Sequence, residues 1–235
     1  MPRYAVISDI HANLNALEAV ITELNKYKPD KWINLGDVVG YGPSSAECID
    51  VLMDLDFESV LGNHDAGVIG KVKLNHFRNP NRRLIELTQS ILQERHLNWL
   101  RNLPLTLELS DKILCTHASP VKPDSWIYLD SAFTVRNILS NLDYDICLFG
   151  HTHLPSMISE KLGVREFKKG IKYMINPGSV GQSRDQDYRA SCCILDTDQW
   201  KCDFYRVDYE IDPVSSKLQK MGFSKTEVNR LLRIR

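Results

Sequence analysis

Five short polar turns, each following an apolar run, constrain this chain more than any other feature. They are Ser8-Asp9-Ile10-His11, Leu35-Gly36-Asp37, Gly62-Asn63-His64-Asp65, Cys115-Thr116-His117 and Gly150-His151-Thr152-His153. Five of the seven histidines lie in these turns, a clustering that random placement would not produce. Because the turns share aspartate, asparagine and histidine, all of which bind metal ions, they indicate a metal site.

In the first 65 residues, short apolar runs typical of strands alternate with segments that have the apolar spacing of helices. Residues 4–7, 31–35 and 57–61 are short apolar runs typical of strands, and the spacing of apolar residues over 14–24 and 45–55 predicts helices. A capping box formed by Ser44 and Glu47 is expected to open the second helix. Strands that alternate with helices predict a parallel layer, in which ligand sites lie at the carboxyl ends of the strands. The first three polar turns stand at such ends.

Residues 66–104 interrupt this alternation. Residues 68–80 are irregular, and helical periodicity over 81–100 ends before Pro104. Two interpretations stay open for this insertion: a wall or lid over the site, or a helix packed on the edge of the sheet.

The second half of the chain has a different pattern. Residues 105–109 and 112–116 predict a hairpin, 133–142 a helix and 146–149 an apolar strand, followed by alternating runs at 157–158, 172–175, 191–195 and 200–207 that predict antiparallel strands. Residues 212–235 predict one or two helices with a basic, solvated face. We therefore expect a single α/β (α+β) domain over residues 1–235, a four-layer α/β/β/α sandwich of two mixed sheets with helices outside.

The composition excludes several classes of protein. A formal net charge of -1 provides no general basic field for nucleic acid or an anionic membrane. Six cysteines are present without any C-x-x-C pair, which favours reduced, packed thiols over disulfides or a zinc site. No run reaches the length of a membrane span and no signal-like apolar region follows Met1, so we expect a cytoplasmic location without membrane contact.

Taken in order, the five turns resemble those of the calcineurin-like metallophosphoesterase superfamily, and the match runs from about residue 4 to about residue 210. Within this superfamily, Gly-Asp-Val-Val-Gly-Tyr-Gly-Pro at residues 36–43 and Asn-Pro-Gly-Ser-Val at 176–180 are similar to a bacterial and archaeal branch often labelled phosphodiesterase or diadenosine tetraphosphatase-like. Any one of the turns is a weak signal, whereas five in this order are specific.

The resemblance implies a centre of two metal ions bridged by Asp37. One ion would be held by Asp9, His11, Asp37 and His153, and the other by Asp37, Asn63, His117 and His151. The implied reaction is hydrolysis of a small phosphomonoester or phosphodiester, of nucleotide type, by a hydroxide that bridges the metals, with His64 as the general acid. Nitrogen and oxygen ligands without thiolate suit Mn, Fe, Co, Ni or Zn better than magnesium or calcium.

One departure from the family pattern is expected to matter. Phosphoprotein phosphatases and symmetric diadenosine tetraphosphate hydrolases carry Gly-Asp-x-x-Asp-Arg-Gly, whereas Gly40 and Tyr41 stand here in place of the Asp-Arg pair. The carboxylate that orients the catalytic histidine in those enzymes is therefore missing, which argues against protein phosphatase activity. The residue that supports His64 here is not evident from the sequence.

Other polar residues have structural readings that compete with functional ones. His76 and His96 lie outside the turns and are expected to be structural, Asp65 is a capping residue or an orienting carboxylate, and Cys115 is expected in the core. The turn at 176–179 either binds phosphate or is a plain turn, Arg184 and Arg189 are candidate anion contacts, and the basic end at 225–235 is expected to be solvated.

Two functions from other classes compete with the hydrolase. One is a metal-free scaffold that keeps the fold and binds a partner, and the fully occupied ligand positions argue against it. The other is a nuclease, which the near-neutral charge argues against. The sequence identifies neither substrate-binding residues nor the oligomeric state.

Overall fold

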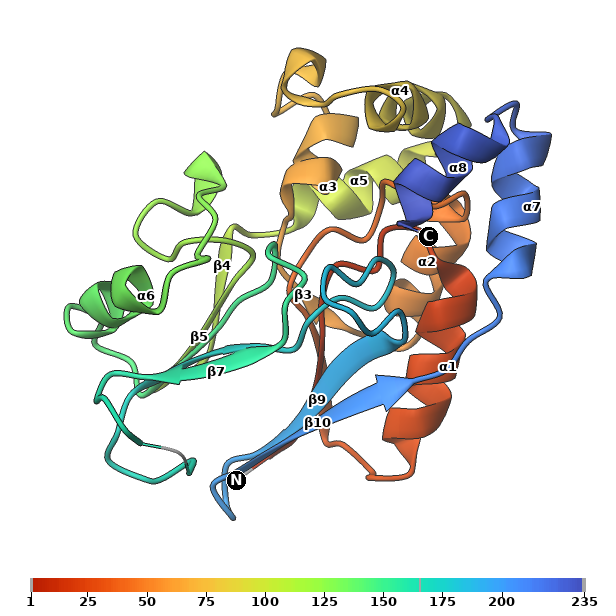
Figure 1. Ribbon diagram of the computed structural model, residues 1–235. Helices are drawn as coiled ribbons and strands as arrows, with labels where there is room; N and C mark the ends of the chain where they lie inside the picture. Colours follow the sequence, from red (N-terminus) through yellow and green to blue (C-terminus); the bar gives the residue numbers. More distant parts are fainter. Residues whose placement is uncertain (1, 165, 234–235) are drawn as a thin grey trace.

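Alternating side chains along β1 (Arg3–Ile7) face two different apolar layers. Tyr4 and Val6 pack into the core between two sheets, while Ala5 and Ile7 pack against helices on the outer face. The computed structural model describes residues 2–164 and 166–233, and Figure 1 shows the two sheets face to face with helices on their outer sides. The predicted α/β fold of two mixed sheets with helices outside is confirmed.

The first sheet has the strand order β10-β9-β1-β2-β3. Strands β1, β2 and β3 are parallel, and β9 pairs antiparallel with both β1 and β10. Its other members are β2 (Lys31–Asn34), β3 (Glu58–Ser59), β9 (Ala190–Asp196) and β10 (Lys201–Val207). Two helices, α1 (Leu14–Asn25) and α2 (Ser45–Asp54), cover its outer face.

The second sheet has the order β4-β5-β6-β8-β7 and carries α6 (Ala132–Leu139) on its outer face. Its members are β4 (Thr106–Ser110), β5 (Ile113–Thr116), β6 (Ile146–Leu148), β7 (Ser156–Ser159) and β8 (Tyr173–Asn176). The predicted hairpin of β4 and β5 is confirmed. The expectation that the runs after residue 149 form antiparallel strands is wrong in one pairing, because β8 lies parallel to β6, as β5 also does.

Residues 81–100 form two helices instead of the single one predicted. Between α4 (Asn81–Ile91) and α5 (Glu94–Asn102) the backbone is extended at Leu92 and Gln93. Nδ1 of His96 accepts a hydrogen bond from the Gln93 backbone at 3.2 Å, and its Nε2 lies 3.0 Å from the carboxylate of Asp50. His96 therefore starts a new helix, which confirms its structural reading. Before α4 come α3 (Asn63–Val68) and a short 3-10 turn, η1 (Leu74–His76).

The C-terminal region forms two helices, α7 (Asp212–Lys220) and α8 (Lys225–Leu232), which pack on α4. Lys217 of α7 donates to Ser44 at 2.9 Å and also binds Glu47. The capping box predicted for these two residues is therefore absent, because a lysine distant in sequence occupies both side chains. Within the described ranges, no helix is both long and apolar enough to cross a membrane.

Candidate metal centre

The carboxyl ends of parallel strands from both sheets bring the five polar turns together. Asp9 and His11 follow β1, Asp37 follows β2, and Asn63 begins α3 directly after β3. From the second sheet, one turn follows β5 and another follows β6, and these supply His117, His151 and His153. With the exception of the partly exposed Asn63, all of these side chains are buried.

The turns hold an unusual backbone conformation at five of these residues. Positive φ angles occur at Asp9, His11, Asp37, His151 and His153, with values between 48° and 67°. Non-glycine residues adopt this left-handed region at a cost of roughly 1–3 kcal/mol each, and such strain concentrates at functional sites. The packing of the two sheets therefore maintains a local arrangement that the isolated turns would not favour.

Asp9, His11 and His153 form the first group of potential ligands, with their donor atoms within 4.8 Å of one another. Asp9 Oδ1 lies 3.3 Å from His153 Nε2 and 3.8 Å from His11 Nε2. The other carboxylate oxygen, Oδ2, accepts hydrogen bonds from the Ser8 hydroxyl and from the His151 backbone. Asp9 Oδ1 is buried without a hydrogen-bond partner, so it is available to a cation.

Asp37, His117 and His151 form a second group beside the first. Asp37 Oδ2 lies 3.3 Å from His117 Nε2 and 3.7 Å from His11 Nε2, so this oxygen stands between the two groups. The amide oxygen of Asn63 lies 3.3 Å from His117 Nε2. All seven residues predicted as ligands are thus brought to one place.

Backbone carbonyls fix how the four histidines present their rings. Nδ1 of His11 donates to Val39, Nδ1 of His117 to Leu35, Nδ1 of His153 to Gln182 and Nε2 of His151 to Trp126, over 2.6–3.1 Å. In the neutral ring this leaves the other nitrogen with a free lone pair directed into the site. Such carbonyl contacts are the usual partners of histidines that bind metal.

The charges at the site favour a cation. Burial alone would raise the pKa of Asp37, but His117 and His64 outweigh that effect and hold the pKa well below its usual range. Burial lowers the pKa of His117, yet Asp37 outweighs it and raises the pKa to about 9. Positive charge is therefore stabilised next to Asp37. The oxygen and nitrogen donors, together with the unpaired Asp9 oxygen, fit divalent metal ions.

His64 lies at the edge of the two groups in an aromatic environment. Its ring lies 4.7 Å from the rings of both His11 and Tyr41 and 5.1 Å from that of Phe77. Its backbone N–H donates to Asp37 at 2.8 Å, whereas Nδ1 has no hydrogen-bond partner. Burial lowers the pKa of His64 to about 4. Packing of aromatic rings thus supports His64 here, together with the Asp37 carboxylate, whose Oδ2 lies 4.0 Å from His64 Nε2.

The comparison with protein families decides the identity of this fold. The model of the calcineurin-like phosphoesterase superfamily domain matches residues 3–200. The chain belongs to this superfamily. It is therefore a hydrolase that acts on phosphate esters, in a superfamily of enzymes that depend on a dinuclear metal centre.

Individual relatives within the calcineurin-like superfamily agree with this assignment. A crystal structure of a metallophosphoesterase from Sphaerobacter thermophilus matches with a TM-score of 0.84 and 36% identity, covering 97% of each chain. The uncharacterized protein MJ0912 of Methanocaldococcus jannaschii is 39% identical over 92% of this chain and 91% of its own length. A symmetrical bis(5'-nucleosyl)-tetraphosphatase of Photorhabdus laumondii is 33% identical, but over only 48% of this chain and 42% of that protein.

Several residues with two sequence interpretations have defined roles in this calcineurin-like fold. Asn176 donates to the Gly150 carbonyl at 2.8 Å, and Ser179 donates to the Asp9 carbonyl at 2.8 Å. The turn at 176–179 therefore braces two of the polar turns, which is the structural reading. The carboxylate of Asp65 accepts from the Gly62 backbone at 3.0 Å, as a capping residue does.

The two arginines proposed as anion contacts differ. Arg184 lines the cavity beside the metal-ligand candidates, whereas Arg189 pairs with Asp187 at 2.7 Å and does not line that cavity. The interpretation of Arg189 as an anion contact is therefore wrong. Cys115 is fully buried between the sheets, and burial raises the pKa of its thiol well above the usual value, so it is a core residue.

The sequence analysis missed other residues at the site. Gln182 supplies the carbonyl that holds His153, and Trp126 supplies the carbonyl that holds His151. Arg230 and Arg233 are exposed, as expected of the basic end, and both also line the same cavity, which we had not expected. No local pattern marks these residues, because each acts through a contact with a segment distant in sequence.

Proposed function

We propose that this enzyme hydrolyses small phosphate esters of nucleotide type at a centre of two divalent metal ions. The proposed ligands are those of the sequence prediction: Asp9, His11, Asp37 and His153 for one ion, and Asp37, Asn63, His117 and His151 for the other. When bound, such ions activate water and stabilise negative charge on the phosphate. The observation that supports this proposal is the position of Asp37 Oδ2 between two groups of inward-facing imidazoles.

His64 is the proposed catalytic residue. It lines the cavity and adjoins Asn63, and its Nε2 lies 4.0 Å from Asp37 Oδ2, on the side of the metal-ligand candidates, whereas its Nδ1 is buried against Gly40. In this role His64 supplies a proton to the departing oxygen, and the negative charge of a bound phosphate favours the protonated ring. Tyr41 and Phe77 hold the ring in place by packing against it.

Residues 66–104 are proposed as a wall of the site within a single domain of residues 1–235. Val72, Phe77 and Arg78 line a cavity of about 650 Å³ that adjoins the metal-ligand candidates. Its other side is formed by residues after β5 and β6, which include Tyr128 and His151. The insertion thus separates the reacting groups from bulk solvent on one side.

The donor set suits Mn, Fe, Co, Ni or Zn, and we propose Mn²⁺ as the first ion to test. A cytoplasmic location is proposed from the six free cysteines, five of which are buried.

The direct experiment assays the purified full-length protein with added Mn²⁺ on p-nitrophenyl phosphate, bis-p-nitrophenyl phosphate and a panel of nucleotides. Metal-dependent turnover of at least one ester is expected, and a chelator should abolish it. Absence of turnover on every ester, with metal demonstrably bound, would favour the scaffold function over hydrolysis. Faster cleavage of single-stranded nucleic acid than of any small ester would favour a nuclease.

A further inference from the structure

The cavity beside the metal-ligand candidates is lined by cations without compensating anions. Four arginines line it, namely Arg78, Arg184, Arg230 and Arg233, and none of its lining residues is an aspartate or glutamate. Within residues 2–164 and 166–233, no carboxylate lies within ion-pairing distance of these four guanidinium groups. Four positive charges that share a cavity repel one another, and binding of an anion would relieve this repulsion.

Several arginines elsewhere on the surface do have acidic partners. Arg83 lies 3.7 Å from Glu227, Arg95 lies 2.5 Å from Asp50 and Arg101 lies 2.6 Å from Glu94. The chain thus balances arginines of neighbouring helices with acidic partners. Arg136 on α6 also lacks an acidic partner within the described ranges, so what distinguishes the cavity is that four unpaired arginines are gathered in one place.

Neutral groups hold Arg184 in place without cancelling its charge. Its guanidinium donates to the Tyr128 hydroxyl at 3.0 Å and to the Tyr41 hydroxyl at 3.5 Å. Tyr128 in turn packs on the ring of His151, with 4.0 Å between the ring centroids. A guanidinium fixed in this way is prepared to bind a phosphate without a large loss of side-chain freedom.

The end of α8 is attached to the metal-ligand candidates through Gln182. The backbone carbonyl of Gln182 accepts from His153, and its side-chain amide donates to the carbonyl of Leu231. Leu231 and Val228 anchor α8 in an apolar cluster with α4 and α7. Arg230 and Arg233, on either side of this anchored turn, are thereby directed to the cavity.

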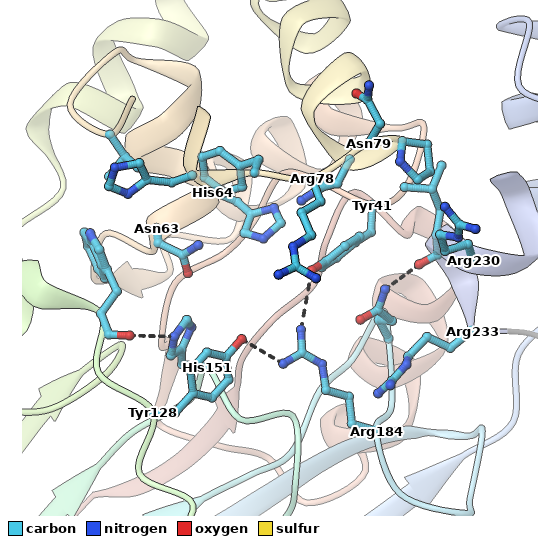
Figure 2. A pocket seen from close by; sticks show the side chains of 18 of the residues that line it. Tyr41, Asn63, His64, Arg78, Asn79, Tyr128, His151, Arg184, Arg230 and Arg233 are labelled. Atoms are coloured by element: carbon cyan, nitrogen blue, oxygen red, sulfur yellow. Dashed lines mark hydrogen bonds between the residues drawn. The ribbon is translucent and has the colours of Figure 1, made fainter. Parts of the chain in front are cut away.

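Figure 2 shows how the charges are arranged across the cavity. Asn63, His64 and His151 lie on one side, and Arg230 and Arg233 lie on the opposite side. Arg78 and Arg184 lie between these two groups. Positive charge therefore extends from the candidate metal centre to the C-terminal helix.

We propose that these four arginines form an anion subsite for two further phosphate groups of the substrate. The inference rests on the proposed function: with the scissile phosphate at the metal centre, Arg78 and Arg184 bind the adjoining phosphate and Arg230 and Arg233 bind the distal one. The substrate class is an organic polyphosphate, such as a dinucleoside polyphosphate. Arg230 and Arg233 act as specificity-determining residues and have no part in the bond cleavage.

The test compares two substrates in three proteins. The substrates are diadenosine tetraphosphate and bis-p-nitrophenyl phosphate, which has a single phosphate. The proteins are the wild type, the double variant Arg230→Gln/Arg233→Gln and Lys225→Gln, a control that removes an exposed charge from the same helix. The double variant should raise KM for the tetraphosphate at least about tenfold, equivalent to roughly 1.4 kcal/mol, and change KM for the diester less than about twofold. Lys225→Gln should change neither.

A binding measurement separates failure of the subsite from failure of the proposed function. Calorimetric titration of the same proteins with inorganic tripolyphosphate, with and without Mn²⁺ in excess, measures binding at the subsite independently of turnover. If the wild type binds tripolyphosphate and the double variant does not, while no protein hydrolyses any ester, the subsite is supported and the proposed function is refuted. Hydrolysis of the diester with no tripolyphosphate binding, or equal losses on both substrates, would refute the subsite alone.

Discussion

His11 Nε2 and His153 Nε2 lie 3.1 Å apart, although both rings direct their Nδ1 to backbone carbonyls. In the neutral rings, two lone pairs would face each other at this distance. Such a contact is unfavourable unless a positive charge lies beside both nitrogens, and the unpartnered Asp9 Oδ1 faces the same point. The relationship of these two imidazoles is therefore the signature of a cation site.

Replacement of His64 tests its role as a proton donor. His64→Ala should retain bound metal and lose turnover on alkyl esters by about 10²–10⁴-fold, because an alkoxide needs a proton to leave. The loss on p-nitrophenyl esters should be much smaller, because p-nitrophenolate leaves without protonation. The measurement is kcat on both ester types, with the metal content determined for each protein. Equal losses on the two ester types would contradict the proton-donor role.

Gly40 controls the position of His64. Its φ angle is +92°, and a methyl group there would collide with the imidazole of His64. Gly40→Ala should therefore lower kcat about tenfold or more, since a small displacement of a catalytic group is costly.

Gly70→Ala is the matched control, because Gly70 also has a positive φ of +77° but no atom within 4 Å of the added methyl group. This variant should keep wild-type kcat. A similar loss of kcat in both variants would attribute the effect to backbone strain and not to the contact with His64.

Asn176 is expected to stabilise the fold by bracing the turn at Gly150. Its amide donates to Gly150 and to Thr152, and its carbonyl accepts from Gly178. Asn176→Ala leaves buried polar groups unpaired and should lower the free energy of unfolding by about 1–3 kcal/mol, measured by urea denaturation.

An exposed asparagine provides the comparison. Asn141 donates to Asn137 and to Ser140 at the surface, so Asn141→Ala should change the free energy of unfolding by less than about 0.5 kcal/mol. Comparable effects of the two substitutions would mean that the bracing contacts contribute little to stability.

The cysteines are expected to differ in reactivity. Five are buried and only Cys202 is partly exposed, and burial raises the pKa of Cys147 to about 12. A thiol reagent such as Ellman's should therefore modify at most one cysteine of the native protein, and all six after denaturation. Cys202→Ser should remove the native reaction. Rapid modification of several thiols in the native protein would show that the core between the sheets is more accessible than the packing indicates.

The turns at the strand ends could be predicted because their signal is local. Asp9 and His11 follow an apolar run directly, and the carboxyl ends of parallel strands meet at one edge of the sheet independently of the rest of the chain. The local sequence around Asp37 and His117 does not indicate that they lie together, because they follow strands of two different sheets. Their grouping came from the resemblance of the ordered turns to a known family.

Features that depend on contacts between distant segments could not be predicted. The break between α4 and α5 exists because His96 caps the second helix while it contacts Asp50. Lys217 displaces the capping box of Ser44. The direction of Arg230 depends on the attachment of α8 by Gln182, which no pattern in residues 225–235 reveals.

The central claim is a centre of two metal ions that share Asp37. Its most direct test is the metal content of the protein after incubation with Mn²⁺ and gel filtration, measured by inductively coupled plasma mass spectrometry. The account predicts about two ions per chain in the wild type and fewer than about one in Asp37→Asn, because this residue contacts both groups of ligands. A wild-type protein without bound metal, or an Asp37→Asn variant that keeps two ions, would contradict it.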